Sequence, residues 1–264
     1  MRSILSMASA TDTGLVRQRN EDSLAIDAKR GIAVLADGMG GYNAGDVASN
    51  MAVSLLLKAL SSRLGSRSNP KLESILREEI AKSNLAIYQA SVVQTQYAGM
   101  GTTLVLAVFQ NDQVVVAHIG DSRLYRLRGG VLEQLTHDHS LFQEQVDQGV
   151  YSREELTLFH PKNLVTRALG VDLDVETDVS TYPTQIDDIY LLCSDGLTDM
   201  AEVDDIRDTI DLKRDNLKQA AQALVKLAND HGGRDNIAVV LAKVCKPFTF
   251  GGAIFKTFGG RFFV

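Results

Sequence analysis

Three apolar segments of this chain end in the same way, and the repetition constrains the fold more than any other feature. Each segment reads as a buried strand and runs directly into a turn that carries an aspartate. A fourth aspartate, Asp235, comes just before another apolar segment. The strands and their acidic turns are Ile32–Ala36 with Asp37-Gly38, Val114–Ile119 with Gly120-Asp121, Ile189–Ser194 with Asp195-Gly196, and Ile237–Val244 after Asp235. If neighbouring strand ends meet at one edge of a sheet or sandwich, four carboxylates converge there.

Carboxylates that converge need compensation, because each ionised group raises the pKa of the others. A divalent cation supplies it. The candidate ligands are hard oxygens, with no His/Cys cluster at zinc spacing, so magnesium or manganese is favoured over zinc or copper, and more than one ion could share the acids. The alternative is a set of four independent turns, which explains each turn but not their repetition.

The remaining pattern indicates an α+β fold built in layers. Strand-like segments at 102–109 and 113–119 flank a turn at Asn111-Asp112, and 123–128 and 131–135 flank Gly129-Gly130, so successive hairpins predict antiparallel sheet. Helical periodicity covers about 44–60, 70–96, 203–211 and 215–230, and further strands are expected at 174–180 and 188–194. Residues 137–170 read as a partly helical surface excursion. Strands and helices that occur in antiparallel groups favour α+β layers over alternating βαβ units.

Composition excludes several classes of function. The 264 residues carry a net charge of −6, which argues against a nucleic-acid partner and suits a protein that binds cations. No run approaches the roughly 18 apolar residues of a membrane span, and no signal peptide is apparent. Cys193 and Cys245 lie in apolar surroundings without metal spacing, so we expect buried thiols in a reducing compartment and a cytoplasmic location.

Several other features have ordinary structural explanations. His118 lies within a strand and is expected to be a satisfied core histidine, and His137, His139 and His160 form no Ser/His/Asp pattern, so covalent catalysis is set aside. Residues 11–22 read as a solvated loop. Residues 248–264 hold six of the nine phenylalanines, and we expect an extension that packs on its own domain, with docking on a partner or a membrane surface as the alternative.

With these residues in hand, the chain closely resembles the metal-dependent type 2C (PPM) family of protein serine/threonine phosphatases, in its compact bacterial form. The matching motifs occur in the order of the family and span about residues 8–245. They are Arg17-x-x-Asn20-Glu21-Asp22, Asp37-Gly38-Met39-Gly40-Gly41, Gly99-x-Gly101-Thr102-Thr103, Gly120-Asp121-Ser122-Arg123, Ser194-Asp195-Gly196 and Gly233-Arg234-Asp235-Asn236. The resemblance implies an αββα sandwich, two antiparallel sheets flanked by antiparallel helix pairs. It also implies one phosphatase domain over 1–247, a flap at about 138–165, and a Gly/Phe-rich tail at 248–264.

The resemblance also implies roles for the acidic residues and a metal-dependent reaction. Two to three Mn²⁺ or Mg²⁺ ions are expected, and a hydroxide that bridges two of them attacks phosphorus in line, without a phosphoenzyme. The implied metal residues are Asp37 as the bridge, the Gly38 carbonyl, Asp195 and Asp235, and Asp121 for a third ion shared with Asp195. Asp22 would support the waters around the metals from behind, and Arg17 would hold the substrate phosphate.

Two departures from the family bear on the chemistry. Animal members commonly carry a histidine, proposed as the general acid, where this chain has Met39, so the proton for the leaving group must come from elsewhere, such as a metal-bound water. Many bacterial relatives have a histidine at the position of Tyr42, so substrate contacts there are expected to differ.

The expected partners are phosphorylated proteins and a cognate bacterial Ser/Thr kinase whose action the enzyme opposes, and the expected state is a monomer. Two other classes of function remain as alternatives. A module of the same fold could bind phosphoproteins without turnover. A dinucleotide-binding enzyme is suggested by Gly38-x-Gly40-Gly41, although Asn43 stands where the third glycine belongs.

Overall fold

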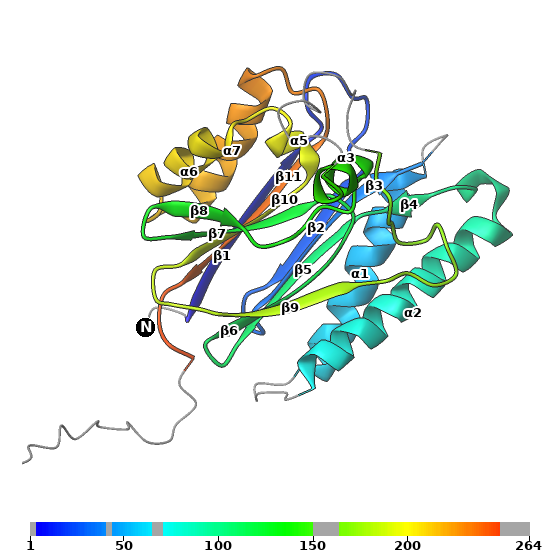
Figure 1. Cartoon of the computed structure of the whole chain (residues 1–264), viewed down its shortest axis with the longest axis horizontal. Helices are drawn as coiled ribbons and strands as arrows, with labels where there is room; N and C mark the ends of the chain where they lie inside the picture. The colour runs from blue at the N-terminus through cyan, green and yellow to red at the C-terminus, as the bar shows by residue number, and fades with distance from the viewer. Residues whose placement is uncertain (1–3, 41–43, 65–70, 150–163, 249–264) are drawn as a thin grey trace, which may run out of the picture.

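Two antiparallel β-sheets stacked face to face form the centre of the molecule (Figure 1). The computed structural model describes residues 4–40, 44–64, 71–149 and 164–248. One sheet has the strand order β1-β11-β10-β7-β8 and the other has β2-β3-β5-β6-β9, with β4 paired to β3. The strands are β1 (Leu5–Asp12), β2 (Asp22–Asp27), β3 (Ile32–Met39), β4 (Gly101–Thr102), β5 (Leu104–Gln110), β6 (Gln113–Ile119), β7 (Arg123–Arg128), β8 (Val131–Gln134), β9 (Asp178–Pro183), β10 (Ile189–Cys193) and β11 (Ile237–Val244).

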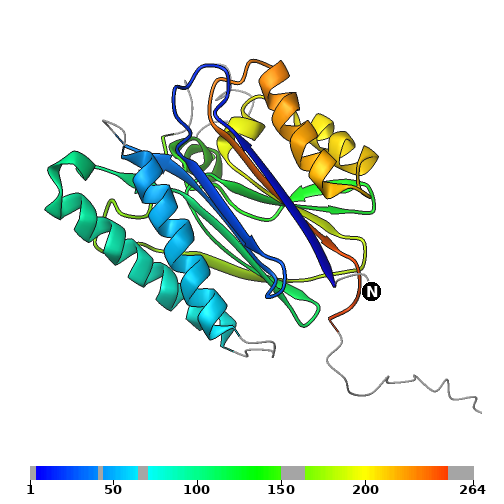
Figure 2. The same cartoon turned by 180° about the vertical axis from the view of Figure 1, so that it is seen from behind.

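Helices cover the outer face of each sheet. In Figures 1 and 2, α1 and α2 lie together beside the β2-β3-β5-β6-β9 sheet, and α6 and α7 lie together beside the other. Each helix buries an apolar stripe against its sheet, as Ala48, Ala52 and Leu56 do on α1. The helical elements are α1 (Gly45–Arg63), α2 (Leu72–Val93), the short 3₁₀ helix η1 (Thr95–Tyr97), α3 (Leu141–Asp147), α5 (Asp195–Thr198), α6 (Val203–Leu212) and α7 (Leu217–Asp230).

The central strands are apolar on both faces because both faces are covered. Along β3, Ile32 and Val34 pack toward the helices, whereas Ala33 and Leu35 pack toward the other sheet. Side chains alternate between the two faces of a strand, so each successive residue enters a different core layer. This packing explains why the sequence shows continuous apolar runs rather than the alternating pattern of a half-exposed sheet.

The predicted α+β sandwich is therefore confirmed, and most element predictions hold to within a few residues. Both hairpin turns were placed correctly, because Asn111 and Asp112 have φ of 53° and 56°, and Gly129 and Gly130 have φ of 57° and 81°. These positive φ values belong to the tight turns that suit the twist of a hairpin. The main misses are β1 and β2, whose small and polar residues gave no strand pattern, and β9, which lies later than the expected 174–180.

Several expectations concern other parts of the chain. Cys193 is buried as predicted, but Cys245 is partly exposed because it follows the end of β11. Residues 150–163 of the expected flap, with His160, lie outside the described residues. So do Tyr42 and nearly all of the phenylalanine-rich tail, from residue 249 on. Among the helices that the structure describes, none combines the length and apolar character needed to cross a membrane.

Candidate metal centre

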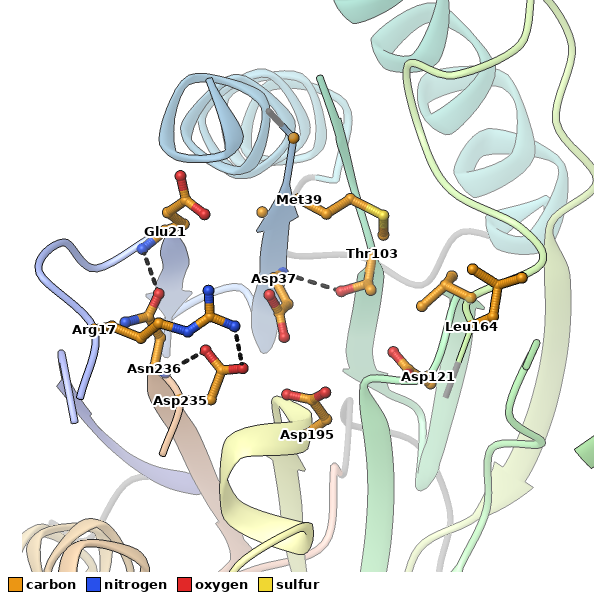
Figure 3. A pocket seen from close by; sticks show the side chains of 13 residues that line it. Arg17, Glu21, Asp37, Met39, Thr103, Asp121, Leu164, Asp195, Asp235 and Asn236 are labelled. Atoms are coloured by element: carbon orange, nitrogen blue, oxygen red, sulfur yellow. Dashed lines mark hydrogen bonds and ion pairs between the residues drawn. The ribbon is translucent and has the colours of Figure 1, made fainter. Parts of the chain in front are cut away.

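An acidic pocket of about 350 Å³ opens at one edge of the sandwich, where the predicted strand ends meet. Figure 3 shows the carboxylates of Asp37, Asp121 and Asp195 directed into one space, with Asp235 beside them. The four predicted aspartates thus come together from four different places in the chain. The pocket is lined by Arg17, Glu21, Asp37, Gly38, Met39, Gly40, Thr103, Asp121, Leu164, Val165, Asp195, Asp235 and Asn236.

Thr103 helps to hold Asp37 at the end of β3. The backbone N–H of Asp37 donates to Thr103 Oγ1 at 3.0 Å, and the N–H of Thr103 donates to the Asp37 carbonyl at 2.9 Å. Thr103 Oγ1 also lies 2.7 Å from Ser122 Oγ, beside Asp121. The small polar residues around the pocket therefore fix the backbone of its acids and leave the carboxylates directed into the space.

The carboxylates are in surroundings that disfavour their ionisation. Burial, followed by the charges of Asp22, Asp195, Asp121 and Asp235, raises the pKa of Asp37 well above its usual value. Burial and the neighbouring charges of Asp195 and Asp138 raise the pKa of Asp121 to about 7. Such values are typical of acids that share one site without compensating positive charge.

The donor set fits divalent cations. Asp121 Oδ2 is buried and has no hydrogen-bond partner among the residues that the structure describes, and the same holds for Asp22 Oδ1 behind the pocket. Buried carboxylate oxygens are costly when nothing neutralises them, and oxygen ligands are those that Mg²⁺ and Mn²⁺ prefer. The pocket can therefore accommodate the ions that the sequence predicts.

Asp22 lies behind Asp37 rather than in the pocket lining. The two residues are paired across β2 and β3, and Ser194 Oγ donates to Asp22 Oδ2 at 2.7 Å. Burial is the main cause that raises the pKa of Asp22 to about 7. Its position agrees with the supporting role that the resemblance implies.

Arg17 reaches the pocket from the loop between β1 and β2. Its guanidinium donates to Asp235 Oδ2 at 2.7 Å (Figure 3). The Arg17 side chain is 53% exposed, so its guanidinium is accessible to an anion that enters the pocket. The expected loop over residues 11–22 is shorter, because β1 extends to Asp12 and β2 begins at Asp22. The remaining loop, residues 13–21, is part of the pocket rather than only a solvated connection.

Gly38 occupies a place where no side chain fits. A Cβ there would lie 2.1 Å from the carbonyl oxygen of Gly45 and 2.6 Å from that of Glu21. The Gly38 N–H donates to this same Glu21 carbonyl at 3.1 Å. The glycine thus allows the start of α1, the β2 loop and the end of β3 to meet beside Asp37.

Sequence reasoning gave no separate role to several residues of the pocket. Asn236 Oδ1 accepts from the Glu21 N–H at 2.8 Å, and its amide nitrogen donates to the carbonyls of Thr13 and Arg19, so it ties the Arg17 loop to β11. Glu21 lines the pocket, and burial together with Asp46 raises its pKa. Both residues belong to motifs that the chain shares with the phosphatase family, and this membership is the sequence feature that could have indicated a role for them. Met39 lines the pocket too, so the departure from the animal pattern lies at the site itself.

A second group of titratable residues was missed because its members are far apart in sequence. His118 is buried, as expected for a core histidine, and its ring stacks on that of His139 with centroids 4.7 Å apart. One ligand atom from each of His118, His139 and Asp178 falls within a group 4.8 Å across. No spacing along the chain indicated this group.

Comparison with known proteins shows which family the chain belongs to. The family model described as Protein phosphatase 2C matches residues 13–241. The chain is 43% identical over 237 residues to the serine/threonine phosphatase stp of Listeria welshimeri, with 88% of this chain and 93% of that protein covered. It is 37% identical to the protein phosphatase PhpP of Streptococcus pneumoniae over 239 residues, with 89% and 95% covered.

Solved structures of bacterial serine/threonine phosphatases share the fold of this chain. The crystal structure of the serine/threonine phosphatase PstP/Ppp from Mycobacterium tuberculosis matches with a TM-score of 0.84 at 36% identity, over 92% of this chain and 99% of that one. The PstP catalytic domain in complex with two manganese ions matches with a TM-score of 0.81 and the same identity, over 92% and 99% of the two chains. By the match of the family model and by these relatives, the chain belongs to the protein phosphatase 2C family.

Proposed function

We propose that this metal-dependent protein serine/threonine phosphatase hydrolyses phosphoserine and phosphothreonine monoesters in its acidic pocket. Asp37, Asp195 and Asp235, with the Gly38 carbonyl, would hold two ions of Mn²⁺ or Mg²⁺, and Asp121 would hold a third together with Asp195. The observation that carries the proposal is the convergence of the four aspartates on one pocket, where the buried Asp121 Oδ2 has no partner in the described part of the chain.

The cations supply two things when bound: they lower the pKa of water, and they offset the charge on the phosphate oxygens. The protein supplies the arrangement. Four carboxylates on the rigid ends of strands keep the acids close together, so the binding of cations offsets their mutual repulsion. Asp22 supports Asp37 from behind and is itself oriented by Ser194.

Arg17 binds the substrate phosphate in this proposal. Its planar guanidinium offers paired N–H donors that match two phosphate oxygens. The side chain already reaches into the pocket as far as Asp235 and is more than half exposed, so it can turn to a phosphate without disturbing the core. Orientation of the phosphate and neutralisation of its oxygens are the two contributions expected of it.

Met39 cannot protonate the leaving group, because its thioether side chain carries no acidic proton. Water in the pocket is therefore the proposed proton donor. The four aspartates of the pocket would each bind a cation, so none of them serves as the proton donor in this proposal.

The physiological setting is also proposed. We infer that residues 1–247 work as one phosphatase domain, as a monomer in the cytoplasm, and oppose a bacterial Ser/Thr kinase on shared phosphoprotein substrates. The family relatives are bacterial protein phosphatases, which supports this setting.

The test is hydrolysis of a phosphothreonine peptide by the whole protein as Mn²⁺ is titrated. Release of phosphate should depend on Mn²⁺, should stop on addition of EDTA and should return when Mn²⁺ is restored. Calorimetry on the same samples should give at least two binding events. Tight binding of the peptide with no release of phosphate would refute the proposal in favour of a binding module.

A further inference from the structure

One residue, His139, holds both backbone polar groups of the glycine that precedes Asp121. The Gly120 N–H donates to His139 Nδ1 at 3.1 Å, and the Gly120 carbonyl accepts from the His139 N–H at 3.0 Å. Gly120 has φ of 94°, a conformation that residues with a Cβ rarely adopt. Since buried backbone groups must be paired, these two bonds set the direction in which the chain enters Asp121.

The hydrogen bonds also define where the proton of each histidine lies. A backbone N–H can only donate, so Nδ1 of His139 carries its lone pair, and the proton of the neutral ring is on Nε2. That Nε2 lies 3.4 Å from Asp178 Oδ2. His118 Nε2 lies 2.8 Å from the His137 carbonyl, which only accepts, so the proton of His118 is on Nε2 as well. Burial lowers the pKa of both rings, in agreement with neutral imidazoles.

This proton arrangement argues against a metal site at His118, His139 and Asp178, although their ligand atoms are close enough for one. An imidazole that binds a metal places its lone pair on the ion and donates with its other nitrogen. In His139 the lone pair is already used by Gly120, and the nitrogen that faces Asp178 carries the proton. The group therefore supports the His139 ring by stacking: the His118 ring lies against it and is itself held by the His137 carbonyl.

The backbone of His139 also connects the Asp121 turn to another part of the pocket. The Thr166 N–H donates to the His139 carbonyl at 2.9 Å, and the Leu141 N–H donates to the Leu164 carbonyl at 2.9 Å. Leu164 and the next residue, Val165, line the pocket. A single residue thus contacts both the turn that carries Asp121 and the segment that lines the pocket beside Asp121 (Figure 3).

Asp138, the residue before His139, is fixed by an ion pair with Arg123. Asp138 accepts two N–H groups of Arg123 in a largely buried ion pair: Nε donates to Oδ1 at 3.1 Å, and Nη2 donates to Oδ2 at 2.6 Å. Two parallel bonds of this kind fix geometry as well as add energy. Arg123 lies just beyond Asp121 in the chain, so the Asp121 turn is held by 138 and 139 from both of its ends.

We propose that His139 is a positioning residue for the cation site of Asp121: it holds the Gly120 peptide so that the Asp121 carboxylate faces Asp195 across the pocket. The inference rests on the proposed function, because it assigns to His139 the geometry of one of the proposed metal ligands. His139 does not line the pocket, and its side chain acts on the cation site through the Gly120 peptide.

The test compares variants that keep or lose the acceptor for the Gly120 N–H. The side-chain oxygen of His139→Asn can take the place of Nδ1, whereas His139→Leu has no acceptor and His139→Gln places its amide farther out. In the metal-free protein, amide exchange at Gly120 should speed up at least tenfold in the Leu and Gln variants and stay within about threefold of the wild type in the Asn variant. If the Leu variant does not fold, the Gln variant serves the same comparison. Equal exchange rates in all folded variants would overturn the proposal.

Binding of Mn²⁺ by calorimetry supplies the second readout. Loss of the acceptor should weaken the Asp121-dependent event about tenfold and leave the tighter events unchanged. The double variant with Asp121→Asn should bind as Asp121→Asn alone does, because His139 acts through that residue. Independent, additive effects would contradict the proposal, and so would one equivalent of Zn²⁺ retained by the wild type and lost only in the His139 variants. If the wild type itself bound no Mn²⁺, the proposed function would fail, while the exchange experiment would still test the role of His139.

Discussion

At the scale of single residues, ionised Asp37 and Asp121 oppose the stability of the metal-free protein. The pKa values of these two carboxyls are raised in the folded state, to about 7 for Asp121. A carboxyl whose folded pKa is raised contributes stability that is fully present below its unfolded pKa and is lost as pH rises through the folded pKa. For Asp121 this window runs from about 4 to about 7.

The first prediction follows from that sign. In EDTA, the free energy of unfolding of the wild type should fall between pH 6 and pH 8. Asp121→Asn should raise it at pH 8 by about 1–2 kcal/mol and by less at pH 6, because the amide carries no charge to repel Asp195. Urea unfolding at the two pH values measures the difference. A metal-free Asp121→Asn protein that is less stable than the wild type at pH 8 would contradict this account of the pocket.

The residues of the site that sequence could predict are those that follow a recognisable strand. Asp37, Asp121 and Asp195 were found because each ends an apolar run, and the converging strands then bring them together. His139 and Asp178 could not be found in this way. Their significance comes from contacts with Gly120 and with each other, between segments whose pairing no local pattern encodes.

At the scale of elements, the pocket depends on how closely β3 approaches α1. The Gly38 backbone is in contact with the carbonyl of Gly45, the first residue of α1, and a Cβ would fall 2.1 Å from that oxygen. The obstacle is backbone, which cannot rotate away as a side chain can. Adding a methyl group therefore requires the helix to move relative to the strand.

The second prediction is that Gly38→Ala destabilises the protein by about 2–4 kcal/mol and lowers Mn²⁺-dependent turnover of the folded fraction, because the shift displaces Asp37. Thermal and urea unfolding, with turnover normalised to folded protein, measure both effects. Gly129→Asn is the matched control. It lies in open space at a hairpin position with φ of 57°, which asparagine tolerates, so its stability should change by less than about 0.5 kcal/mol. Equal stability and equal turnover of Gly38→Ala and Gly129→Asn would show that the close approach of β3 to α1 at Gly38 has no consequence for the protein.

Helices and strands were predictable from the sequence where apolar residues recur at a clear helical or strand period. The helices α6 and α7 and the β5-β6 and β7-β8 hairpins follow from apolar spacing and from turn residues that accept positive φ. In contrast, β1 was missed because its alternating small and polar residues, Ser6 to Thr11, resemble a loop. It is a strand because β11 offers it a complete antiparallel register, a tertiary contact that overrides weak local preference.

At the scale of the whole molecule, the sandwich separates function from stability along the strands. Asp195 follows β10 and lies in the pocket, whereas Asp188 precedes the same strand and lies at its other end. Asp188 is 1% exposed and accepts from Arg128 Nε at 2.7 Å, from the Gln185 N–H at 2.7 Å and from the Tyr190 hydroxyl at 3.1 Å. These bonds connect the start of β10 to β7 without contact with the pocket.

The third prediction concerns this distant cluster. Asp188→Ala should lower the free energy of unfolding by about 3 kcal/mol, because the partly buried Arg128 guanidinium and the backbone N–H of Gln185 lose the carboxylate to which they donate. Turnover by the folded fraction should stay within about twofold, a change of well under 1 kcal/mol in the barrier. Asp230→Ala, which removes an exposed ion pair with Lys226 on α7, should be close to neutral. A large loss of turnover in folded Asp188→Ala would show that the two ends of the sandwich are not separable.

The central claim is that Asp37 would bind the cations on which hydrolysis depends, and one measurement addresses it directly. Mn²⁺-dependent release of phosphate from a phosphothreonine peptide should be compared for the wild type, Asp37→Asn and the surface control Asp230→Asn. We expect Asp37→Asn to lower kcat by at least about 10²–10³-fold and to weaken Mn²⁺ binding, with the fold retained and the control unchanged. A folded Asp37→Asn variant as active as the wild type at the same Mn²⁺ concentration would contradict the assignment of the site.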